Sequence, residues 1–279
     1  MDLHNSKSYN SNIINKRLSI NGLDISTGTY LGMRSENQDN ITIEYLENRN
    51  IFILCDGHGG SYLSKRIPNM IVNKFLKGID LSDKNIVENI FKEIDSYLYN
   101  EYYLKNKKRE GTTCSIILII DNSIIGINLG DSAYLINSYD KYEYPFIHRP
   151  NNKIEIARIL EAGHKIIKVG KDFRIDGRLS LSRSFGDYTY KFCNNKFNNV
   201  NGAVSCIPNF ERYEKDFDFI ILGSDGFWDF VNKKNVLTYL KLNIRNKSTS
   251  LIVSDLIKIA IQNGSKDNIS IIVIKQCGK

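Results

Sequence analysis

The sequence has no hydrophobic run long enough to cross a membrane. Its longest uninterrupted apolar stretches, residues 51–55 and 116–120, are far shorter than the roughly 18 residues that a spanning helix needs. The N-terminus lacks the apolar segment of a signal peptide, and Asp2 stands where N-myristoylation requires a glycine. We therefore expect an intracellular protein, in the cytoplasm or the nucleus, with no membrane segment.

Paired cysteines are also lacking. The five cysteines show neither a CxxC spacing nor a His/Cys pattern of the kind that binds zinc, which argues against a disulfide framework and fits reduced thiols. No internal repeat and no Pro/Gly/Ser-rich linker divides the 279 residues into two halves. We expect a loosely ordered N-terminal extension at 1–22 and a single domain at 23–279.

The chain has a surplus of positive charge, with 38 basic against 31 acidic residues and a net charge of +7. That surplus suits phosphorylated or acidic partners, but a charge excess without a patch is more typical of a solvated surface. The densest basic run, residues 105–109, has no aromatic side chains interleaved with it for stacking on bases. We therefore do not expect nucleic acid as a partner.

Four aspartates stand beside a glycine or an asparagine in four separate segments. They are Asp56, Asp131, Asp225 and Asp267; the first three each follow an apolar, β-prone run, and the last precedes one. A carboxylate at a strand end can point into a cleft while its strand stays in the core. Converging carboxylates repel one another unless a cation lies between them, and oxygen-only ligands favour Mg²⁺ or Mn²⁺. The pattern therefore predicts metal-assisted hydrolysis, the alternative being ordinary turn aspartates.

The hydrophobic pattern predicts groups of strands and groups of helices. Strands are expected at 41–45, 51–55, 114–120, 123–129, 133–136, 217–222 and 269–274, and helices at 62–76, 84–104, 151–161, 232–240 and 250–262. Strands come in consecutive pairs and helices also pair, unlike the β-α-β alternation of a parallel sheet. Residues 164–202 show weak periodicity and are expected to hold most of the irregular loop. We predict one α+β domain with antiparallel sheets packed between helices.

Nine motifs follow one another between about Gly28 and Ile274. They are Arg34-Ser35-Glu36-Asn37-Gln38-Asp39, Asp56-Gly57-His58-Gly59-Gly60, Gly111-Thr112-Thr113, Gly130-Asp131-Ser132, His148-Arg149-Pro150 with Glu155 and Arg158, Leu181-Ser182-Arg183-Ser184-Phe185-Gly186-Asp187, the segment from Val204-Ser205 to Pro208, Ser224-Asp225-Gly226-Phe227-Trp228-Asp229, and Lys266-Asp267-Asn268. In content and order this set resembles the metal-dependent serine/threonine protein phosphatases of the type 2C family.

The resemblance implies a fold and an activity. The family fold is a four-layer αββα sandwich, in which two antiparallel β-sheets are flanked by helix pairs and metal ions lie in a cleft at one end. The implied reaction is hydrolysis of phosphoserine and phosphothreonine by a metal-activated water at a binuclear Mg²⁺ or Mn²⁺ centre. We expect phosphorylated proteins as partners and a monomer as the working form.

The resemblance also implies which residues bind the metal ions. Asp56 matches the aspartate that bridges both ions, and the adjacent Gly57 matches a ligand through its backbone carbonyl. Asp225 and Asp267 match ligands of the first ion. Asp39 matches an acidic residue near the second ion that acts directly or through water.

Two residues match the groups that handle the substrate. Arg34 matches the residue that grips the substrate phosphate, a task suited to a planar bidentate fork, with a surface salt bridge as the alternative. His58 matches the proposed general acid for the leaving alcohol, and the alternative is a structural histidine in a glycine-rich loop. With Asp56 they form the expected catalytic set.

For each of two aspartates, two alternative roles are expected. Asp131, with Asp225, matches a weaker third metal site of part of the family, or it forms an Asx turn after a strand. Asp229 either holds water near the metal ions or caps the helix that starts near Asn232.

Three positions depart from the common family pattern. Gln38 stands where many members have a glutamate that ligates the second ion; glutamine keeps an oxygen but loses a charge, so we expect weaker binding there. Ala133 stands where an arginine is common, and His164 stands where a second glycine is usual.

Two other functions compete with the phosphatase. A non-catalytic family member would bind or scaffold a partner, but such proteins typically lose metal aspartates, and only Gln38 points that way. A metal-dependent nuclease would need a groove-reading or base-stacking element, which the sequence does not show.

Overall fold

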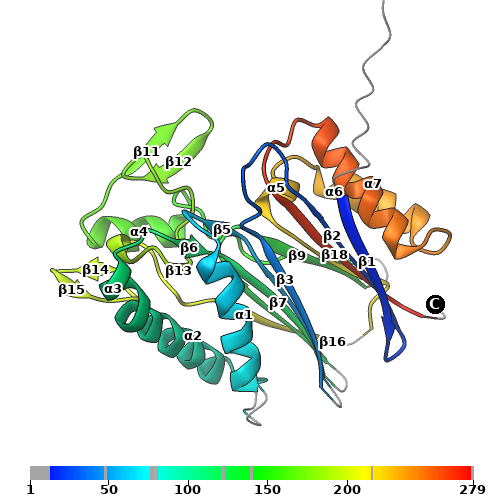
Figure 1. The fold of residues 1–279 in the computed structure, drawn as a ribbon, viewed down its shortest axis with the longest axis horizontal. Coiled ribbons are helices and arrows are strands. Elements are labelled where there is room, and N and C mark those ends of the chain that lie inside the picture. Colours follow the sequence, from blue (N-terminus) through cyan, green and yellow to red (C-terminus); the bar gives the residue numbers. More distant parts are fainter. Residues whose placement is uncertain are drawn as a thin grey trace, which may run out of the picture.

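The computed structural model describes residues 13–46, 49–75, 79, 81–120, 123–138, 141–214 and 216–277. Two antiparallel sheets lie face to face, and helices cover both outer faces (Figure 1). This confirms the predicted α+β class and the αββα sandwich. Among the described residues, no helix is long and apolar enough to span a membrane.

The strands of the sandwich fall into two sheets. One sheet has the order β1 (Ile13–Ile20), β2 (Leu23–Tyr30), β18 (Ile269–Gln276), β17 (Phe219–Gly223), β9 (Ala133–Ser138) and β10 (Lys141–Glu143). The other has the order β16 (Asn209–Glu214), β8 (Ser123–Leu129), β7 (Cys114–Ile120), β4 (Arg49–Cys55) and β3 (Asn40–Leu46). The strands expected at 114–120 and 123–129 are confirmed as β7 and β8, which form an antiparallel hairpin paired from Cys114↔Leu129 to Ile120↔Ser123.

Strand β4 shows why its sequence is apolar without interruption. Phe52 and Leu54 pack between the two sheets, whereas Ile51, Ile53 and Cys55 pack against the helices on the outer face. Successive side chains of a strand point to opposite faces, so a strand that is buried on both faces needs apolar residues at every position. The apolar run ends where β4 leaves the core, so polar residues can follow directly after the strand.

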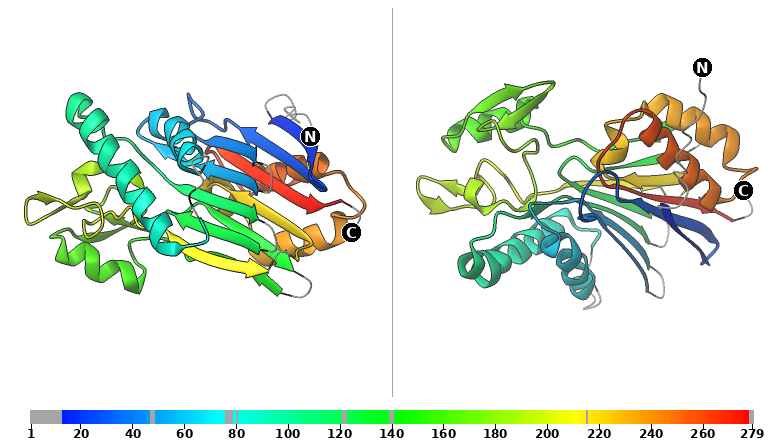
Figure 2. Two further views of the ribbon diagram at one scale, coloured as in Figure 1. Left: turned by 90° about the horizontal axis from the view of Figure 1, so that it is seen from below. Right: turned by 45° about the horizontal axis from the view of Figure 1, so that its top comes forward.

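Helices complete the two outer layers (Figure 2). Helices α1 (Tyr62–Phe75) and α2 (Lys84–Leu98) share a buried cluster with β4 and β7, and α6 (Lys233–Asn243) and α7 (Thr249–Gln262) share one with β17 and β18. The helix expected at 84–104 is shorter: α2 ends at Leu98 and is followed by a π-helical turn at Tyr99–Tyr103 and by α3 (Leu104–Asn106). Leu76, the expected end of the preceding helix, lies outside the described residues.

The N-terminal boundary needs a correction. Residues 13–20, expected in a loosely ordered extension, form β1, which pairs with β2 from Ile13↔Tyr30 to Ile20↔Leu23. Most side chains of β1 are exposed, so this edge strand has little hydrophobic pattern and depends on main-chain pairing. Strands β2 and β16 were also not predicted. The rest of the expected extension, residues 1–12, lies outside the described residues.

One end of the sandwich is covered by shorter elements. They include α4 (Lys153–Glu161), the ribbon of β11 (Ile166–Val169) and β12 (Asp172–Ile175), and the ribbon of β14 (Phe192–Cys193) and β15 (Lys196–Phe197). A small sheet there has the order β13 (Phe185–Gly186), β6 (Gly111–Thr112) and β5 (Gly57–His58). The segment expected to be mostly irregular, 164–202, thus contains short strands that lack a hydrophobic period.

Candidate active site

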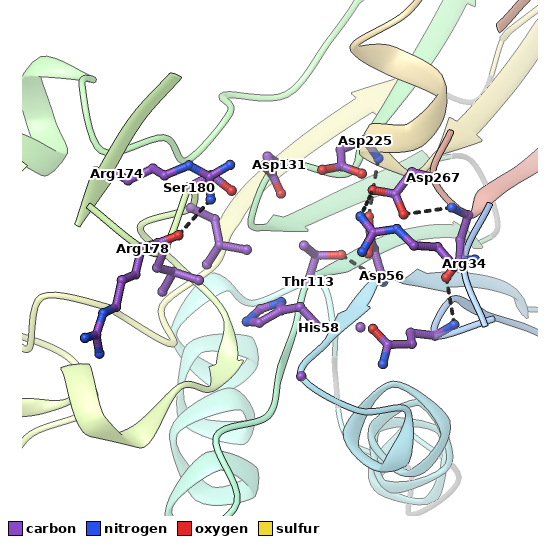
Figure 3. Close-up of a pocket in the computed structure, with 16 residues that line it drawn as sticks. Arg34, Asp56, His58, Thr113, Asp131, Arg174, Arg178, Ser180, Asp225 and Asp267 are labelled. Atoms are coloured by element: carbon purple, nitrogen blue, oxygen red, sulfur yellow. Dashed lines mark hydrogen bonds and ion pairs between the residues drawn. The ribbon is translucent and has the colours of Figure 1, made fainter. Parts of the chain in front are cut away.

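Strand direction brings the four aspartates of the sequence pattern to one end of the sandwich. Asp56 directly follows β4, Asp131 follows β8, and Asp225 follows β17 as the first residue of α5 (Asp225–Trp228). Asp267 precedes β18, which runs antiparallel to β17, so the start of β18 lies beside the end of β17. Figure 3 shows the four side chains together at this end.

The aspartates border a cavity of about 350 Å³. Eight of the nine predicted site residues line it: Arg34, Gln38, Asp56, Gly57, His58, Asp131, Asp225 and Asp267. The ninth, Asp39, is buried beside them and is coupled electrostatically to Asp225 and Asp267. Figure 3 shows the carboxylates between Arg34 at one end and Arg174 and Arg178 at the other.

Burial and mutual repulsion make these carboxylates unusually weak acids. Desolvation, followed by the nearby charge of Asp225, raises the pKa of Asp39 to about 7 and that of Asp131 to about 7. The same causes raise the pKa of Asp56 well above its ordinary value, and burial and Asp229 raise that of Asp225. Each shift reports a free-energy cost of negative charge that a bound cation would relieve.

The donor types therefore fit a hard divalent ion, because the cavity offers carboxylates and a backbone carbonyl and no thiolate. Within the described part of the chain, no three His, Cys, Asp or Glu side chains are gathered around one point as a ready metal site. The carboxylates have protein partners: Asp267 Oδ2 lies 2.6 Å from Arg34 Nη2, and Asp56 Oδ2 accepts from the Asp225 N–H at 3.4 Å.

Asp56 is held by Thr113, which lies between β6 and β7. Its N–H donates to Thr113 Oγ1 at 3.0 Å, and the Thr113 N–H donates to the Asp56 carbonyl at 2.9 Å. The Thr113 hydroxyl also lies 2.7 Å from Ser132 Oγ, beside Asp131. Thr113 therefore connects two of the predicted metal ligands, a role that the sequence did not suggest.

Arg34 lies on the loop between β2 and β3. The loop is attached to the segment before β18, because the Met33 N–H donates to the Lys266 carbonyl at 2.8 Å. The Arg34 side chain is 59% exposed and forms its ion pair with Asp267. The structure thus contains a salt bridge of the kind that the alternative reading expected, but the partner is a predicted metal ligand at the cavity.

Gln38 packs against the glycine-rich loop after β4. Its side-chain amide satisfies both neighbours when it is oriented with the nitrogen donating to the Gly57 carbonyl at 3.2 Å and the oxygen accepting from the Gly60 N–H at 3.2 Å. The Gln38 carbonyl accepts from Ser64 Oγ at 2.5 Å, and its N–H donates to Asn268 Oδ1 at 2.9 Å. A neutral amide can donate to the Gly57 carbonyl, which an ionised carboxylate cannot do.

His58 is paired with an aspartate that the sequence did not assign to the site. Its Nε2 lies 2.8 Å and 2.9 Å from the two carboxylate oxygens of Asp187. Burial opposes a charged imidazole, but the Asp187 carboxylate outweighs it and raises the pKa of His58. The only available signal was the position of Asp187 at the end of a motif.

Asp131 and Asp229 are joined by an arginine. Arg149 Nη2 lies 2.6 Å and 2.8 Å from the oxygens of Asp229 and 3.7 Å from Asp131 Oδ2. The capping alternative for Asp229 is wrong, because Asn232 caps α6 through contacts to Lys234 N and Asn235 N. Asp229 instead adds negative charge near Asp131 and Asp225, and its charge raises the pKa of both.

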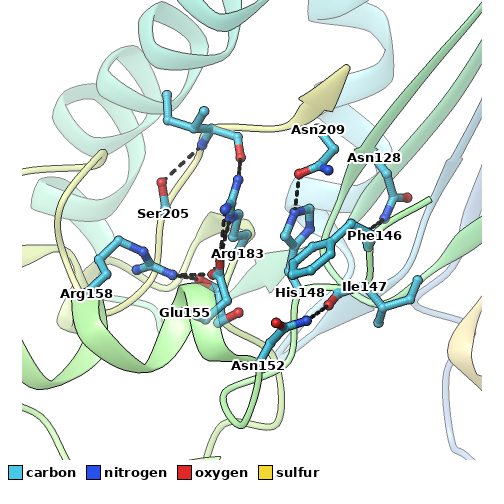
Figure 4. Close-up of polar contacts among 12 residues, drawn as sticks. Asn128, Phe146, Ile147, His148, Asn152, Glu155, Arg158, Arg183, Ser205 and Asn209 are labelled. Carbon is cyan, nitrogen blue, oxygen red and sulfur yellow. Dashed lines mark hydrogen bonds and ion pairs between the residues drawn. The ribbon is translucent and has the colours of Figure 1, made fainter. Parts of the chain in front are cut away.

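Glu155, Arg158 and Arg183 form a buried ionic network beside His148 (Figure 4). Glu155 accepts from Arg158 at 2.5 Å and from Arg183 at 2.6 Å, and these charges lower the pKa of Glu155 to about 2 against the effect of burial. His148 Nδ1 accepts from the Gly130 N–H at 3.1 Å, so its Nε2 carries the hydrogen toward Asn209 Oδ1 at 2.8 Å. The His148 contact thus holds the backbone at Gly130, the residue directly before Asp131.

The two departures from the family pattern at Ala133 and His164 lie outside the cavity lining. Ala133 is fully buried, and its carbonyl accepts from Trp228 Nε1 at 3.0 Å. His164 Nδ1 lies 2.7 Å from Asp176 Oδ2 at the base of the β11–β12 ribbon. The Ala133 side chain packs in the buried cluster of α6 and α7, and the His164 ring is paired with Asp176.

Comparison with known proteins agrees with the fold and the motif order. The family model for protein phosphatase 2C matches residues 24–269. Protein phosphatase 1A of Bos taurus is 28% identical over 278 residues, which cover 91% of this chain and 71% of that protein. Probable protein phosphatase 2C 7 of Oryza sativa subsp. japonica is 29% identical over 231 residues, covering 81% of this chain and 57% of that protein.

Solved structures show the same architecture. The crystal structure of a phosphatase from a pathogenic strain of Toxoplasma gondii superimposes with a TM-score of 0.81 and covers 96% of both chains at 20% identity. At 20% identity this superposition shows that the two proteins share a fold, and no more. Because the family model covers most of the sequence, this protein belongs to the protein phosphatase 2C family.

Proposed function

We propose that the cavity is the active site at which this protein, a metal-dependent serine/threonine phosphatase of that family, hydrolyses phosphoserine and phosphothreonine in other proteins. The observation that carries the proposal is the set of buried aspartates at one end of the sandwich, whose pKa values are raised by burial and mutual repulsion. Buried carboxylates with raised pKa values are typical of a site that binds cations.

The cavity residues can be assigned to individual metal ions. When bound, divalent ions would lower the pKa of a water molecule and neutralise the phosphoryl oxygens. We assign two ions to the site, with a weaker third between Asp131 and Asp225. The protein ligands of the two main ions would come from Asp56, the Gly57 carbonyl, Asp225, Asp267, Asp39 and Gln38.

Arg34 would bind the substrate phosphate. Its guanidinium is exposed at the cavity mouth and already pairs with an oxygen anion, Asp267, so a phosphate would replace one anionic partner by another. His58 would donate the proton that the leaving alcohol needs. Asp56 would contribute to catalysis through the ions that it holds.

The scaffold hypothesis is the competing function. Gln38 is the residue in its favour, because its amide engages the Gly57 carbonyl, which is one of the assigned metal ligands. The retained aspartates favour an enzyme. The nuclease hypothesis has no support from the family to which the chain belongs.

The first test is turnover of a phosphothreonine peptide in a Mn²⁺ and Mg²⁺ titration, beside calorimetric metal binding and the variant Asp225→Ala. We expect hydrolysis that requires added metal, stops with chelator and disappears in the variant together with most of the metal binding. A folded wild-type protein that binds metal but shows no turnover would favour the scaffold.

Location and assembly are further proposals. We place the protein inside the cell as a monomer. Light scattering behind size exclusion would test the second point, and fractionation of the cells that express the protein would test the first.

A further inference from the structure

Asp187, the partner of His58, has no role in the reaction described so far. His58 Nε2 lies 2.8 Å and 2.9 Å from the two oxygens of Asp187, so one ring nitrogen is fully engaged by the carboxylate. That leaves Nδ1 as the ring atom that can donate to a substrate. His58 lines the cavity, whereas Asp187 is 6% exposed and lies behind it.

The small three-stranded sheet brings the pair together. In its register both His58 and Gly186 lie opposite Gly111, and Asp187 is the residue after Gly186. Gly111 also provides the space for the pair. A Cβ atom at that position would lie 2.2 Å from Asp187 Oδ2 and 2.4 Å from His58 Nε2.

Hydrogen bonds with Ser184 and Glu110 hold Asp187 in place. Ser184 Oγ donates to Asp187 Oδ2 at 2.6 Å, and the Asp187 N–H donates to the Glu110 carbonyl at 2.9 Å. The backbone at Asp187 has a φ of +52°, a left-handed conformation that aspartate and asparagine tolerate better than most residues.

A buried ion pair holds the same turn. Lys191 Nζ donates to Asp95 Oδ1 at 2.8 Å and to the Ser184 carbonyl at 2.8 Å, and Asp95 Oδ1 also accepts from the Gly186 N–H at 3.0 Å. Lys191 and Asp95 are both fully buried. Asp187 therefore has a defined position relative to helix α2 and to the cavity.

We propose that Asp187 is a positioning residue for the general acid: its carboxylate accepts from His58 Nε2–H and thereby turns Nδ1–H toward the leaving oxygen of the substrate. The inference rests on the proposed function. As a water oxygen bonds to phosphorus and the phosphorus–oxygen bond to the side chain breaks, the electron pair of that bond stays on the departing oxygen. The Nδ1 proton transfers to that oxygen, which gives the alcohol and inorganic phosphate. The ring takes up a proton from solvent before the next turnover.

The test compares two leaving groups in the variant Asp187→Asn. An alkoxide leaving from phosphothreonine needs a proton, whereas p-nitrophenolate leaves without one. Asparagine keeps the left-handed backbone and the side-chain size but offers no carboxylate to the ring. We expect kcat for a phosphothreonine peptide to fall on the order of 10²-fold with KM unchanged. We expect kcat for p-nitrophenyl phosphate to stay near the wild-type value.

The chain offers a matched control. Asp176 also has a left-handed backbone, with φ of +50°, and also pairs with a histidine, since its Oδ2 lies 2.7 Å from His164 Nδ1. It does not line the cavity. Asp176→Asn should leave both activities unchanged. In the double variant His58→Gln/Asp187→Asn, the peptide activity should fall no further than in His58→Gln alone.

Several outcomes overturn the inference. Equal losses on both substrates would assign Asp187 a structural role, and no loss on either would remove it from catalysis. If Asp187→Asn does not fold, Ser184→Ala, which removes one hydrogen bond to the carboxylate, must show a smaller loss confined to the peptide. A wild-type protein that hydrolyses neither substrate with metal would refute the proposed function itself, which is a different result from equal losses in the variant.

Discussion

Replacing Asp95 by asparagine is expected to lower the free energy of unfolding by about 3–5 kcal/mol. The Asp95–Lys191 pair is fully buried, with a distance of 2.8 Å between Oδ1 and Nζ. At that distance and an effective dielectric constant of about 20, the attraction is about 6 kcal/mol. Asparagine keeps an oxygen that can accept from the ammonium and from the Gly186 N–H, which recovers about 1–2 kcal/mol.

The pair itself contributes little, because desolvation nearly balances the attraction. Burial raises the pKa of Asp95 even though Lys191 lies beside it. The loss in Asp95→Asn therefore comes from a buried ammonium without a counter-charge. The double variant Asp95→Asn/Lys191→Met leaves no such charge, so it should lose less stability than the sum of the single variants.

Urea unfolding can measure these differences through Trp228, the only tryptophan, which is 6% exposed in the folded protein. Lys105→Met is the control, because its partner Glu101 lies on the surface and little change is expected. A loss below about 1 kcal/mol in Asp95→Asn would refute the reasoning, as would strict additivity in the double variant.

Two further predictions concern His148 and Gln38. Burial and the nearby Arg183 lower the pKa of His148 to about 4 from about 6.5 in the unfolded chain, so stability due to this group is complete above pH 6.5 and falls toward pH 4. Urea unfolding at pH 7 and pH 5 should show the stability of His148→Gln improving by about 2 kcal/mol relative to wild type on acidification; an unchanged difference would contradict the pKa shift. Gln38→Glu should tighten Mn²⁺ binding about tenfold by calorimetry, because a carboxylate adds ligand charge. Weaker binding would mean that the amide contact to Gly57 matters more than charge.

Much of the fold could be predicted because its long strands carry a clear hydrophobic pattern. β4, β7 and β8 are buried on both faces, and a shift of one residue would exchange the side chains of the two core layers, so their register is strongly specified. No position of β1 or β16 is fully buried, so these strands carry no such pattern, and they were not predicted.

The sequence by itself determined which aspartates meet at one end of the sandwich, because they follow or precede recognisable strands and the motifs occur in a family order. It did not determine their partners. His58 and Asp187 are 129 positions apart and meet through strands of two residues, and Arg34 and Asp267 are 233 positions apart. Such pairs depend on loop conformations and on the register of short strands, which leave no periodicity in the chain. Only the tertiary structure decides them, because only the folded backbone sets the distances over which side-chain charges and hydrogen bonds act.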